Sequence, residues 1–253
     1  MSFVVVIPAR YSSSRLPGKP LKDLCGKTMI ARVAEKALAS GADAVYVATD
    51  SELVADAVKL DGVEVVMTSK EHNSGTERLA EVARLMNFDD SAIVVNVQGD
   101  EPLMPPVLIS QVARLLEDGD APMATLSVPI TEYDEIFNPN AVKVVTDEAG
   151  NALYFSRAPI PYERDNFTKK PGVFENIHFR HLGIYAYRAG FLQKFVNWKS
   201  SALEDFEKLE QLRVLSHGEK IRVAVAEVVP PAGIDTQEDL EKVVAYLREH
   251  PEA

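Results

Sequence analysis

The sequence predicts an α/β protein whose core is a mostly parallel, doubly wound β-sheet, with a smaller antiparallel lobe attached to it. From residue 3 to about residue 130, short runs rich in Val and Ile alternate with amphipathic segments, and such alternation implies repeated βαβ units. The runs show little alternation of polar and apolar residues, so we expect helices on both faces of the sheet. Functional side chains then belong at the carboxyl ends of the strands.

The elements of this first part follow one another in a regular order. The expected strands are residues 3–7, 44–48, 63–67, 92–97 and 123–130. The amphipathic segments between them, at residues 29–39, 52–59 and 76–86, are expected to be helices.

After residue 130 the pattern changes to three strand-like segments with no clear helix among them. These segments are residues 141–147, 152–157 and 181–188. They indicate an antiparallel excursion and predict a sub-lobe at about residues 131–188. Residues 157–180 are rich in Pro, Asn, Lys and Glu, and a loop of this length is usually functional, so we expect it to cover a ligand or contact a partner subunit.

The C-terminal part returns to the α/β pattern. Helical spacing runs over residues 201–215 and a further strand over residues 221–229. Thr236 and Asp239 are suitably spaced to cap a last helix that ends near Glu249. We therefore expect residues 1–253 to form a single domain with one sub-lobe.

Composition limits the class of protein. A chain of 253 residues with 46% apolar residues can bury a full core. One cysteine excludes a disulfide framework, and no secretory leader or membrane-spanning run is present, so we expect a soluble protein of the cytoplasm. The net charge of −11 opposes binding to nucleic acid and anionic membranes. Any local cluster of cations is therefore informative.

Such a cluster follows the first strand. Arg10, Arg15 and Lys19 lie within ten residues, together with three serines and a glycine, a composition that suits a phosphate clamp. A triphosphate carries about four negative charges, which an acidic protein can hold only with a concentrated basic patch, hydroxyls and backbone amides. The spacings of the dinucleotide-binding and P-loop glycine motifs are absent. A solvated basic loop is the alternative.

Carboxylates follow the strand at residues 92–97. Gln98, Asp100 and Glu101 come directly after it, and Gly99 permits a close backbone approach. Mg2+ is commonly held by one or two carboxylates plus substrate phosphate, so Asp100 suits a metal site; the alternative is an Asp that caps the turn. Asp235 is a candidate second ligand, but any helix N-terminus displays the same pattern, and spacing leaves the two possibilities open.

Other polar residues are weaker candidates. Ser74, Thr76 and Arg78 stand at the start of a predicted helix, whose amides suit phosphate or ribose oxygens, although Ser74 could be only a cap. A scattered later set suits a ligand with a carboxylate and many hydroxyls, namely Arg157, His181, Tyr185, Glu210 and Gln211. Taken singly, His181 could equally be structural and Glu210 solvated. No nucleophile elbow is present, so the chemistry is expected to be electrostatic.

Nine segments in order carry a specific resemblance. They are residues 7–21, 47–50, 74–81, 94–102, 137–145, 153–157, 180–188, 209–213 and 233–241. Together they resemble the 3-deoxy-manno-octulosonate cytidylyltransferases, also called CMP-KDO synthetases. The similarity runs nearly end to end and is weakest at residues 161–178.

The resemblance implies an activity and a set of roles. The reaction would be CTP + KDO giving CMP-KDO and pyrophosphate, with Mg2+ as cofactor, for lipopolysaccharide inner-core synthesis in the cytoplasm of a Gram-negative organism. Such enzymes are commonly homodimers, so we expect one here, with contacts in the sub-lobe. By position, CTP would be bound by Arg10, Arg15, Lys19, Ser74, Thr76 and Arg78; Mg2+ by Asp100 and Asp235; and KDO by Gln98, Arg157, His181, Tyr185, Glu210 and Gln211. Arg15, Lys19, Asp100 and Asp235 would be the catalytic residues.

Three other functions compete with this one. A related cytidylyltransferase would activate 8-amino-KDO or sialic acid. A nucleotide-sugar glycosyltransferase also places an acid pair after a strand, but has no need of three cations after the first strand. A non-catalytic nucleotide-binding module would bind CTP without turnover.

Overall fold

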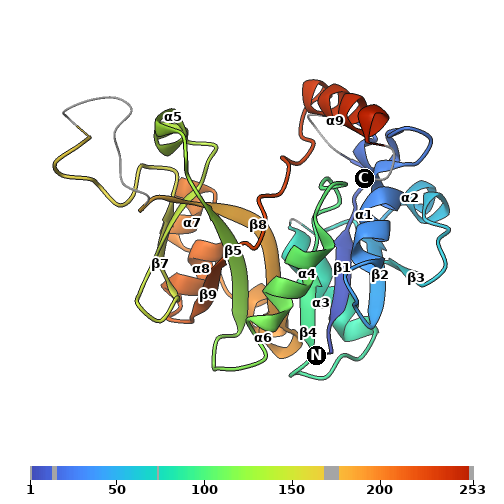
Figure 1. Cartoon of the computed structure of the whole chain (residues 1–253). Helices are drawn as coiled ribbons and strands as arrows, with labels where there is room; N and C mark the ends of the chain where they lie inside the picture. Colours follow the sequence, from blue (N-terminus) through green and yellow to red (C-terminus); the bar gives the residue numbers. More distant parts are fainter. Residues whose placement is uncertain (1, 13–15, 73, 168–176, 251–253) are drawn as a thin grey trace.

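The computed structural model describes residues 2–12, 16–72, 74–167 and 177–250. These residues form one nine-stranded sheet whose main path has the order β3-β2-β1-β4-β8-β5-β9 (Figure 1). The strands of this path are β1 (Val4–Pro8), β2 (Ala44–Thr49), β3 (Val63–Met67), β4 (Ile93–Asn96), β5 (Met123–Pro129), β8 (Phe179–Arg188) and β9 (Ile221–Val225). Along the path every strand except β8 runs in the same direction. The predicted mostly parallel sheet is confirmed.

Helices cover both faces of the sheet because successive side chains of each strand point to opposite sides. In β1, Val5 and Ile7 belong to one core and Val6 to the other. The first core is closed by α1 (Met29–Leu38), α2 (Glu52–Ala57) and α4 (Pro106–Arg114). The second core is closed by α3 (Gly75–Leu85), α6 (Ala189–Val196) and α8 (Gln211–Ser216). The doubly wound arrangement expected from the Val- and Ile-rich runs is thus present.

The lobe differs from the prediction in the place of its third strand. A hairpin of β6 (Lys143–Thr146) and β7 (Ala152–Ser156), together with the short helix α5 (Tyr133–Phe137), lies at one end of the sheet, away from β1, β2 and β3 (Figure 1). β8, however, is an interior strand of the main sheet between β4 and β5. It is ten residues long, so its first residues also pair with β6 while its later residues pair with β4.

The helical segment predicted over residues 201–215 is interrupted. α7 (Ala202–Glu207) begins with a capping box formed by Ser201 and Glu204 and ends at Lys208, whose φ of 55° is left-handed. α8 then starts at Gln211. The break turns the chain so that Glu210 lies at the start of the second helix rather than on a solvated face.

The last helix, α9 (Gln237–Glu249), packs on the loop that follows β1. Leu240, Val243 and Leu247 share an apolar cluster with Leu16 and Leu24. The predicted cap is confirmed, since Thr236 and Asp239 form a reciprocal capping box. To reach this position the chain crosses from β9 to the end of the sheet that carries β1 (Figure 1), and it brings Asp235 along. In the part of the chain described, no helix combines the length and apolar character needed to span a bilayer.

Candidate active site

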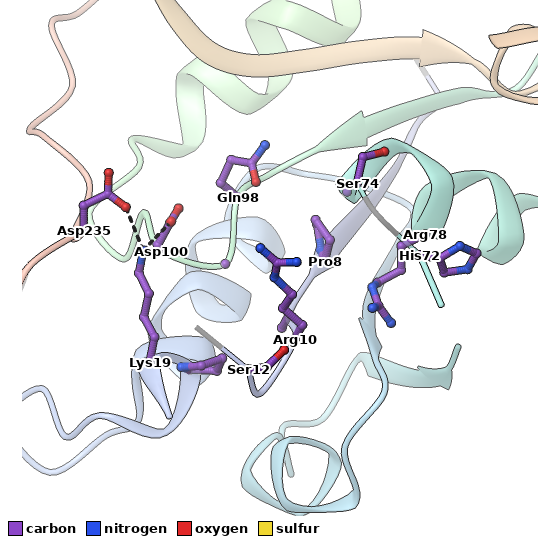
Figure 2. Close-up of a pocket in the computed structure, with 14 residues that line it drawn as sticks. Pro8, Arg10, Ser12, Lys19, His72, Ser74, Arg78, Gln98, Asp100 and Asp235 are labelled. Atoms are coloured by element: carbon purple, nitrogen blue, oxygen red, sulfur yellow. Dashed lines mark hydrogen bonds and ion pairs between the residues drawn. The ribbon is translucent and has the colours of Figure 1, made fainter. Parts of the chain in front are cut away.

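A polar pocket lies at the carboxyl ends of β1 and β4. Its charged and polar lining consists of Arg10, Ser12, Lys19, His72, Ser74, Arg78, Gln98, Asp100 and Asp235. Lys19 and the two aspartates lie at one side, Ser74, His72 and Arg78 at the other, and Arg10 and Gln98 between them (Figure 2). Segments far apart in the sequence therefore meet at the edge of the sheet where a parallel α/β fold binds ligands.

The floor of the pocket depends on a glycine. A Cβ atom on Gly99 would stand 2.9 Å from the carbonyl oxygen of Pro8, a distance that real Cβ atoms do not show. The loop after β4 can therefore lie against the end of β1 only with glycine at this position. This close approach places Gln98 and Asp100 beside the loop that carries Arg10.

An ammonium group joins the two aspartates. Lys19 Nζ donates to Asp100 Oδ2 at 2.6 Å and to Asp235 Oδ1 at 3.1 Å. The Lys19 side chain is 11% exposed, whereas those of Asp100 and Asp235 are 37% and 48% exposed. The lysine is thus largely withdrawn from water, and the carboxylates face the pocket (Figure 2).

Backbone contacts explain how Asp235 reaches this place. The amide of Ile234 donates to the carbonyl oxygen of Asp100 at 2.9 Å, which ties the segment before α9 to the loop after β4. A Cβ atom on Gly233 would lie 3.2 Å from Glu101 Cγ and 3.3 Å from the same carbonyl oxygen, so the approach is again tight. The cap of α9 is thus Thr236, and Asp235 lines the pocket.

Glu101 follows Asp100 in the chain, and its carboxyl oxygen Oε2 is buried. Burial, with the nearby charges of Asp100 and Asp235, raises the pKa of Glu101 to about 8. Its Oε2 atom makes no hydrogen bond within the described residues. A third carboxyl group therefore lies near the acid pair.

The acid pair fits a hard divalent cation. The ammonium of Lys19 is a stand-in cation between two carboxylates, and Glu101 adds an unsatisfied oxygen nearby. Over the described part of the chain, no group of three or more His, Cys, Asp and Glu side chains is placed to hold a metal ion. Two carboxylates with water and substrate phosphate are the usual set for Mg2+. Asp100 and Asp235 are the residues that could provide it.

The opposite side of the pocket is built on the N-terminus of α3. Ser74 caps the helix, its hydroxyl accepting from the amide of Glu77 at 3.2 Å. Arg78 is buried, with Nη2 3.2 Å from Asp50 Oδ2 and Nη1 donating to Thr68 Oγ1. Asp50 directly follows β2, so the guanidinium is fixed between two strand ends. The predicted CTP residues Arg10, Lys19, Ser74 and Arg78 line this one pocket.

His72 was not predicted from the sequence as a site residue. Its Nε2 lies 2.6 Å from Glu81 Oε2, and its Nδ1 lies 3.7 Å from Glu77 Oε2. The Glu81 oxygen also accepts from the amide of Ser69, so the ring is held from α3 and faces the pocket. Glu77 and Glu81 are one helical turn apart and follow His72 in the sequence. This spacing is the signal that could have predicted a histidine held against the helix.

Thr76, predicted to contact CTP, faces a second and smaller cavity. Its hydroxyl donates to Glu210 Oε2 at 3.0 Å. The cavity is lined by Thr76, Met123, Tyr185, Tyr187, Phe195, Glu210 and Gln211 and has a volume of about 10 Å³, which is room for about one water. Three of the residues predicted to bind KDO are therefore together, at a site closed to a sugar in this conformation. Burial raises the pKa of Glu210, although the Ser74 and Thr76 hydroxyls oppose the rise.

His181 is near this group and neutral. Its Nε2 lies 2.9 Å from Thr125 Oγ1, whose single hydrogen is directed at the carbonyl oxygens of Leu182 and Ile184. The histidine is therefore the donor at Nε2 and an acceptor at Nδ1. Burial and the charge of Arg180 lower the pKa of His181 to about 3.

Arg157 is held by backbone carbonyl groups. Its Nε donates to the carbonyl of Glu207 at 2.7 Å and its Nη1 to that of Pro139 at 2.9 Å, while its own amide donates to the Glu207 carboxylate. Gln98, also predicted to bind KDO, lines the larger pocket. Arg15, predicted to hold the triphosphate, lies outside the described residues.

The mostly parallel sheet and the pocket of cations and carboxylates at its edge are those of an α/β nucleotidyltransferase. A family model described as cytidylyltransferase matches residues 4–221, and relatives that are 63% identical are named 3-deoxy-manno-octulosonate cytidylyltransferase. The chain belongs to this family.

Named relatives extend the match over the whole length. Proteins named 3-deoxy-manno-octulosonate cytidylyltransferase from Aeromonas hydrophila and Vibrio parahaemolyticus are each 63% identical, over 98% of this chain and 99% and 98% of theirs. A solved structure of CMP:2-keto-3-deoxy-manno-octonic acid synthetase complexed with CTP has a TM-score of 0.89 and 42% identity, covering 99% of this chain and 100% of that one. The family resemblance predicted from sequence segments is confirmed.

Proposed function

We propose that this chain transfers CMP from CTP to the anomeric 2-hydroxyl of KDO, giving CMP-KDO and pyrophosphate, for the synthesis of the lipopolysaccharide inner core. The observation that carries the proposal is a single pocket holding Arg10, Lys19, Ser74 and the Asp100–Asp235 pair on the fold of this family. Relatives with that name are 63% identical over nearly the full length, and the similar solved structure holds CTP.

The reaction is a direct displacement. The 2-hydroxyl oxygen of KDO forms a bond to the α-phosphorus of CTP, and the bond from that phosphorus to the bridging oxygen of the β-phosphate breaks. The proton of the hydroxyl passes to water or to the departing pyrophosphate. Both substrates are anions and repel each other, so the site must supply cations before the two can approach. Arg10 and Lys19 do this at the triphosphate, and Arg15 is proposed to share the task. Positioning and charge stabilisation then account for the rate, without a covalent enzyme intermediate.

We propose Mg2+ as the cofactor, held by Asp100 and Asp235. Bound there, the ion would supply positive charge to the phosphoryl oxygens and to the leaving pyrophosphate. The fit rests on the carboxylate pair that already holds a cationic group. Ser74 and Arg78, at the other side of the pocket, are proposed to contact the CMP moiety.

KDO is proposed to lie toward β8 and α8. Arg157 offers a cation for the sugar carboxylate, while His181 Nδ1 and the buried carboxyl of Glu210 offer acceptors for hydroxyls. Gln98, Tyr185 and Gln211 would complete the contacts. Because the cavity beside Tyr185 and Glu210 holds about 10 Å³, sugar binding at that point requires side chains to move apart.

The test is the identity of the product. The purified protein is incubated with CTP and Mg2+ and with KDO, 8-amino-KDO or sialic acid in turn, and products are identified by mass spectrometry. CMP-KDO formed faster than either alternative conjugate supports the proposal. Three results would reject it. They are preferential turnover of another sugar, release of free nucleotide from a nucleotide-sugar donor, and binding of CTP without turnover of any of the three sugars.

We further propose a homodimer that works in the cytoplasm, where CTP is supplied. Large apolar side chains left exposed on β7, in the segment after it and on α7 support the dimer, since Leu153, Tyr162 and Phe206 are 62%, 64% and 88% exposed. Apolar side chains this exposed suit burial against a partner chain. Sedimentation equilibrium of the wild-type chain and of Phe206→Glu tests it: a dimer weakened by the substitution supports the proposal, and a wild-type monomer at all concentrations rejects it.

A further inference from the structure

Lys19 occupies the position that the proposed metal ion needs. Its ammonium lies 2.6 Å from Asp100 Oδ2 and 3.1 Å from Asp235 Oδ1, so one cation already bridges both carboxylates. The side chain is only 11% exposed, far less than expected of a lysine that merely lines a surface. This arrangement goes beyond the expected contact with phosphate and calls for its own explanation.

An ammonium and a divalent ion compete for these two carboxylates. Mg2+ binds carboxylate oxygen at about 2.0–2.1 Å and demands near-octahedral geometry. A cationic nitrogen that bridges the same two side chains would repel the ion and compete with it for the carboxylates. Binding of the ion is therefore favoured when the ammonium moves away.

The Lys19 side chain can move away from the two aspartates while its backbone stays in place. Lys19 begins the short 3-10 turn η1 (Lys19–Leu21), and its amide donates to the carbonyl of Leu16 at 3.1 Å. Four rotatable methylene groups separate this anchored backbone from the ammonium. Arg10 and Ser12 line the same pocket, so a triphosphate held there is within reach of a rotated lysine side chain.

We propose that Lys19 is an exchangeable counter-ion: it neutralises Asp100 and Asp235 until metal and triphosphate arrive together, then yields the carboxylates to Mg2+ and turns to the phosphate. This inference rests on the proposed magnesium site. Binding of the metal without nucleotide is unfavourable, because the metal must displace the Lys19 ammonium from the carboxylates and leave it without an anionic partner. When the triphosphate binds as well, its phosphate oxygens become that partner. Metal and nucleotide therefore bind with positive coupling, which is reciprocal.

Binding of Mn2+ in the absence of nucleotide tests the proposal. Free Mn2+ is followed by electron paramagnetic resonance with wild-type protein, Lys19→Met and Lys22→Met. Lys22→Met is the matched control, since it removes the same charge three residues away and Lys22 does not line the pocket. Each lost ion pair of this exposure is worth a factor of up to about five. Lys19→Met removes two such pairs, so it should bind Mn2+ more tightly than the wild type, by up to about 25-fold, and Lys22→Met should not.

Two further measurements locate the effect. Adding Asp235→Asn to Lys19→Met should remove the gained Mn2+ affinity, because the exchange requires the acid pair. In wild-type protein labelled with 15N in the lysine side chains, the Lys19 ammonium resonance should shift when Mg2+ and CTP are added together, and remain in place with the same Mg2+ concentration alone. This second measurement does not depend on the stability of a variant.

Two results would overturn the exchange. One is Mn2+ affinity of Lys19→Met no greater than that of the wild type and the Lys22→Met control. The other is an ammonium resonance that stays unchanged when Mg2+ and CTP bind. Neither experiment contains KDO or measures turnover, so their failure is distinguishable from failure of the proposed activity, which product formation decides.

Discussion

Neighbouring residues at the start of α9 should respond to substitution in opposite ways. Asp235 directs its carboxylate at Lys19 Nζ, 3.1 Å away, whereas Thr236 caps the helix by accepting from the amide of Asp239 at 3.2 Å. If the first is a metal ligand and the second a cap, Asp235→Asn removes function and spares stability, and Thr236→Ala does the reverse.

The structure sets the expected magnitudes. The Asp235 side chain is 48% exposed, so loss of its ion pair should lower the free energy of unfolding by less than about 1 kcal/mol. Loss of a charge-stabilising ligand should lower kcat by about 100-fold or more. Removal of the Thr236 cap should cost about 1 kcal/mol of stability and leave kcat unchanged, because Thr236 does not line the pocket.

Urea unfolding and pyrophosphate release measured on both variants provide the assay. The metal response is measured at the same time by titrating Mg2+, and Asp235→Asn should require more of it. Wild-type activity and metal response in Asp235→Asn would refute the reasoning and return Asp235 to an ordinary helix terminus. A loss of activity in Thr236→Ala at unchanged stability would refute it equally.

Three further predictions concern Thr76, Asp50 and His181. Thr76→Val should lower the free energy of unfolding by about 1–2 kcal/mol, because the buried Glu210 loses a donor, and should raise KM for KDO more than for CTP; equal rises would count against the placement of the sugar. Asp50→Asn leaves the buried Arg78 without its charge partner and should cost about 3 kcal/mol, measured by urea unfolding; a change below 1 kcal/mol would show that the pair is unimportant. The pKa of His181 in the folded state, about 3, lies below its unfolded value of about 6.5, so the unfolded chain takes up the proton first. Stability should therefore fall as pH drops below about 6.5, by up to about 1.4 kcal/mol per pH unit, and His181→Gln should show a shallower slope; an unchanged slope would refute the shift.

The sheet was predictable because its strands are buried on both faces. Runs such as Val4–Pro8 and Ala44–Thr49 carry apolar residues for two cores at once, which polar alternation would forbid. The position of β8 was not predictable in the same way. Its sequence is that of a buried strand, but pairing with β4 and β5 depends on contacts between residues far apart in the chain. The interruption at Lys208 also lacks the glycine that usually marks a left-handed helix end.

In the candidate site, too, features set by local sequence could be predicted, and features set by contacts between distant residues could not. Asp100 could be predicted because it follows a buried strand, and Lys19 because it belongs to a dense basic loop. The proximity of Asp235 required the tertiary fold, since a backbone bond from Ile234 to Asp100 brings the two segments together. The contact of Thr76 could not be predicted, because its location in the first turn of α3 does not reveal which way the hydroxyl points. It faces Glu210, which is brought there by the break before α8.

The most direct measurement of the central claim is pyrophosphate release with KDO and each of the four nucleoside triphosphates, with and without Mg2+. The proposed function predicts rapid release with CTP, KDO and Mg2+ together, and a loss of nearly all of it when Mg2+ is chelated or KDO is omitted. Asp100→Asn should behave like the chelated enzyme while remaining folded. Equal release with another triphosphate, or release that is independent of KDO, would contradict the account.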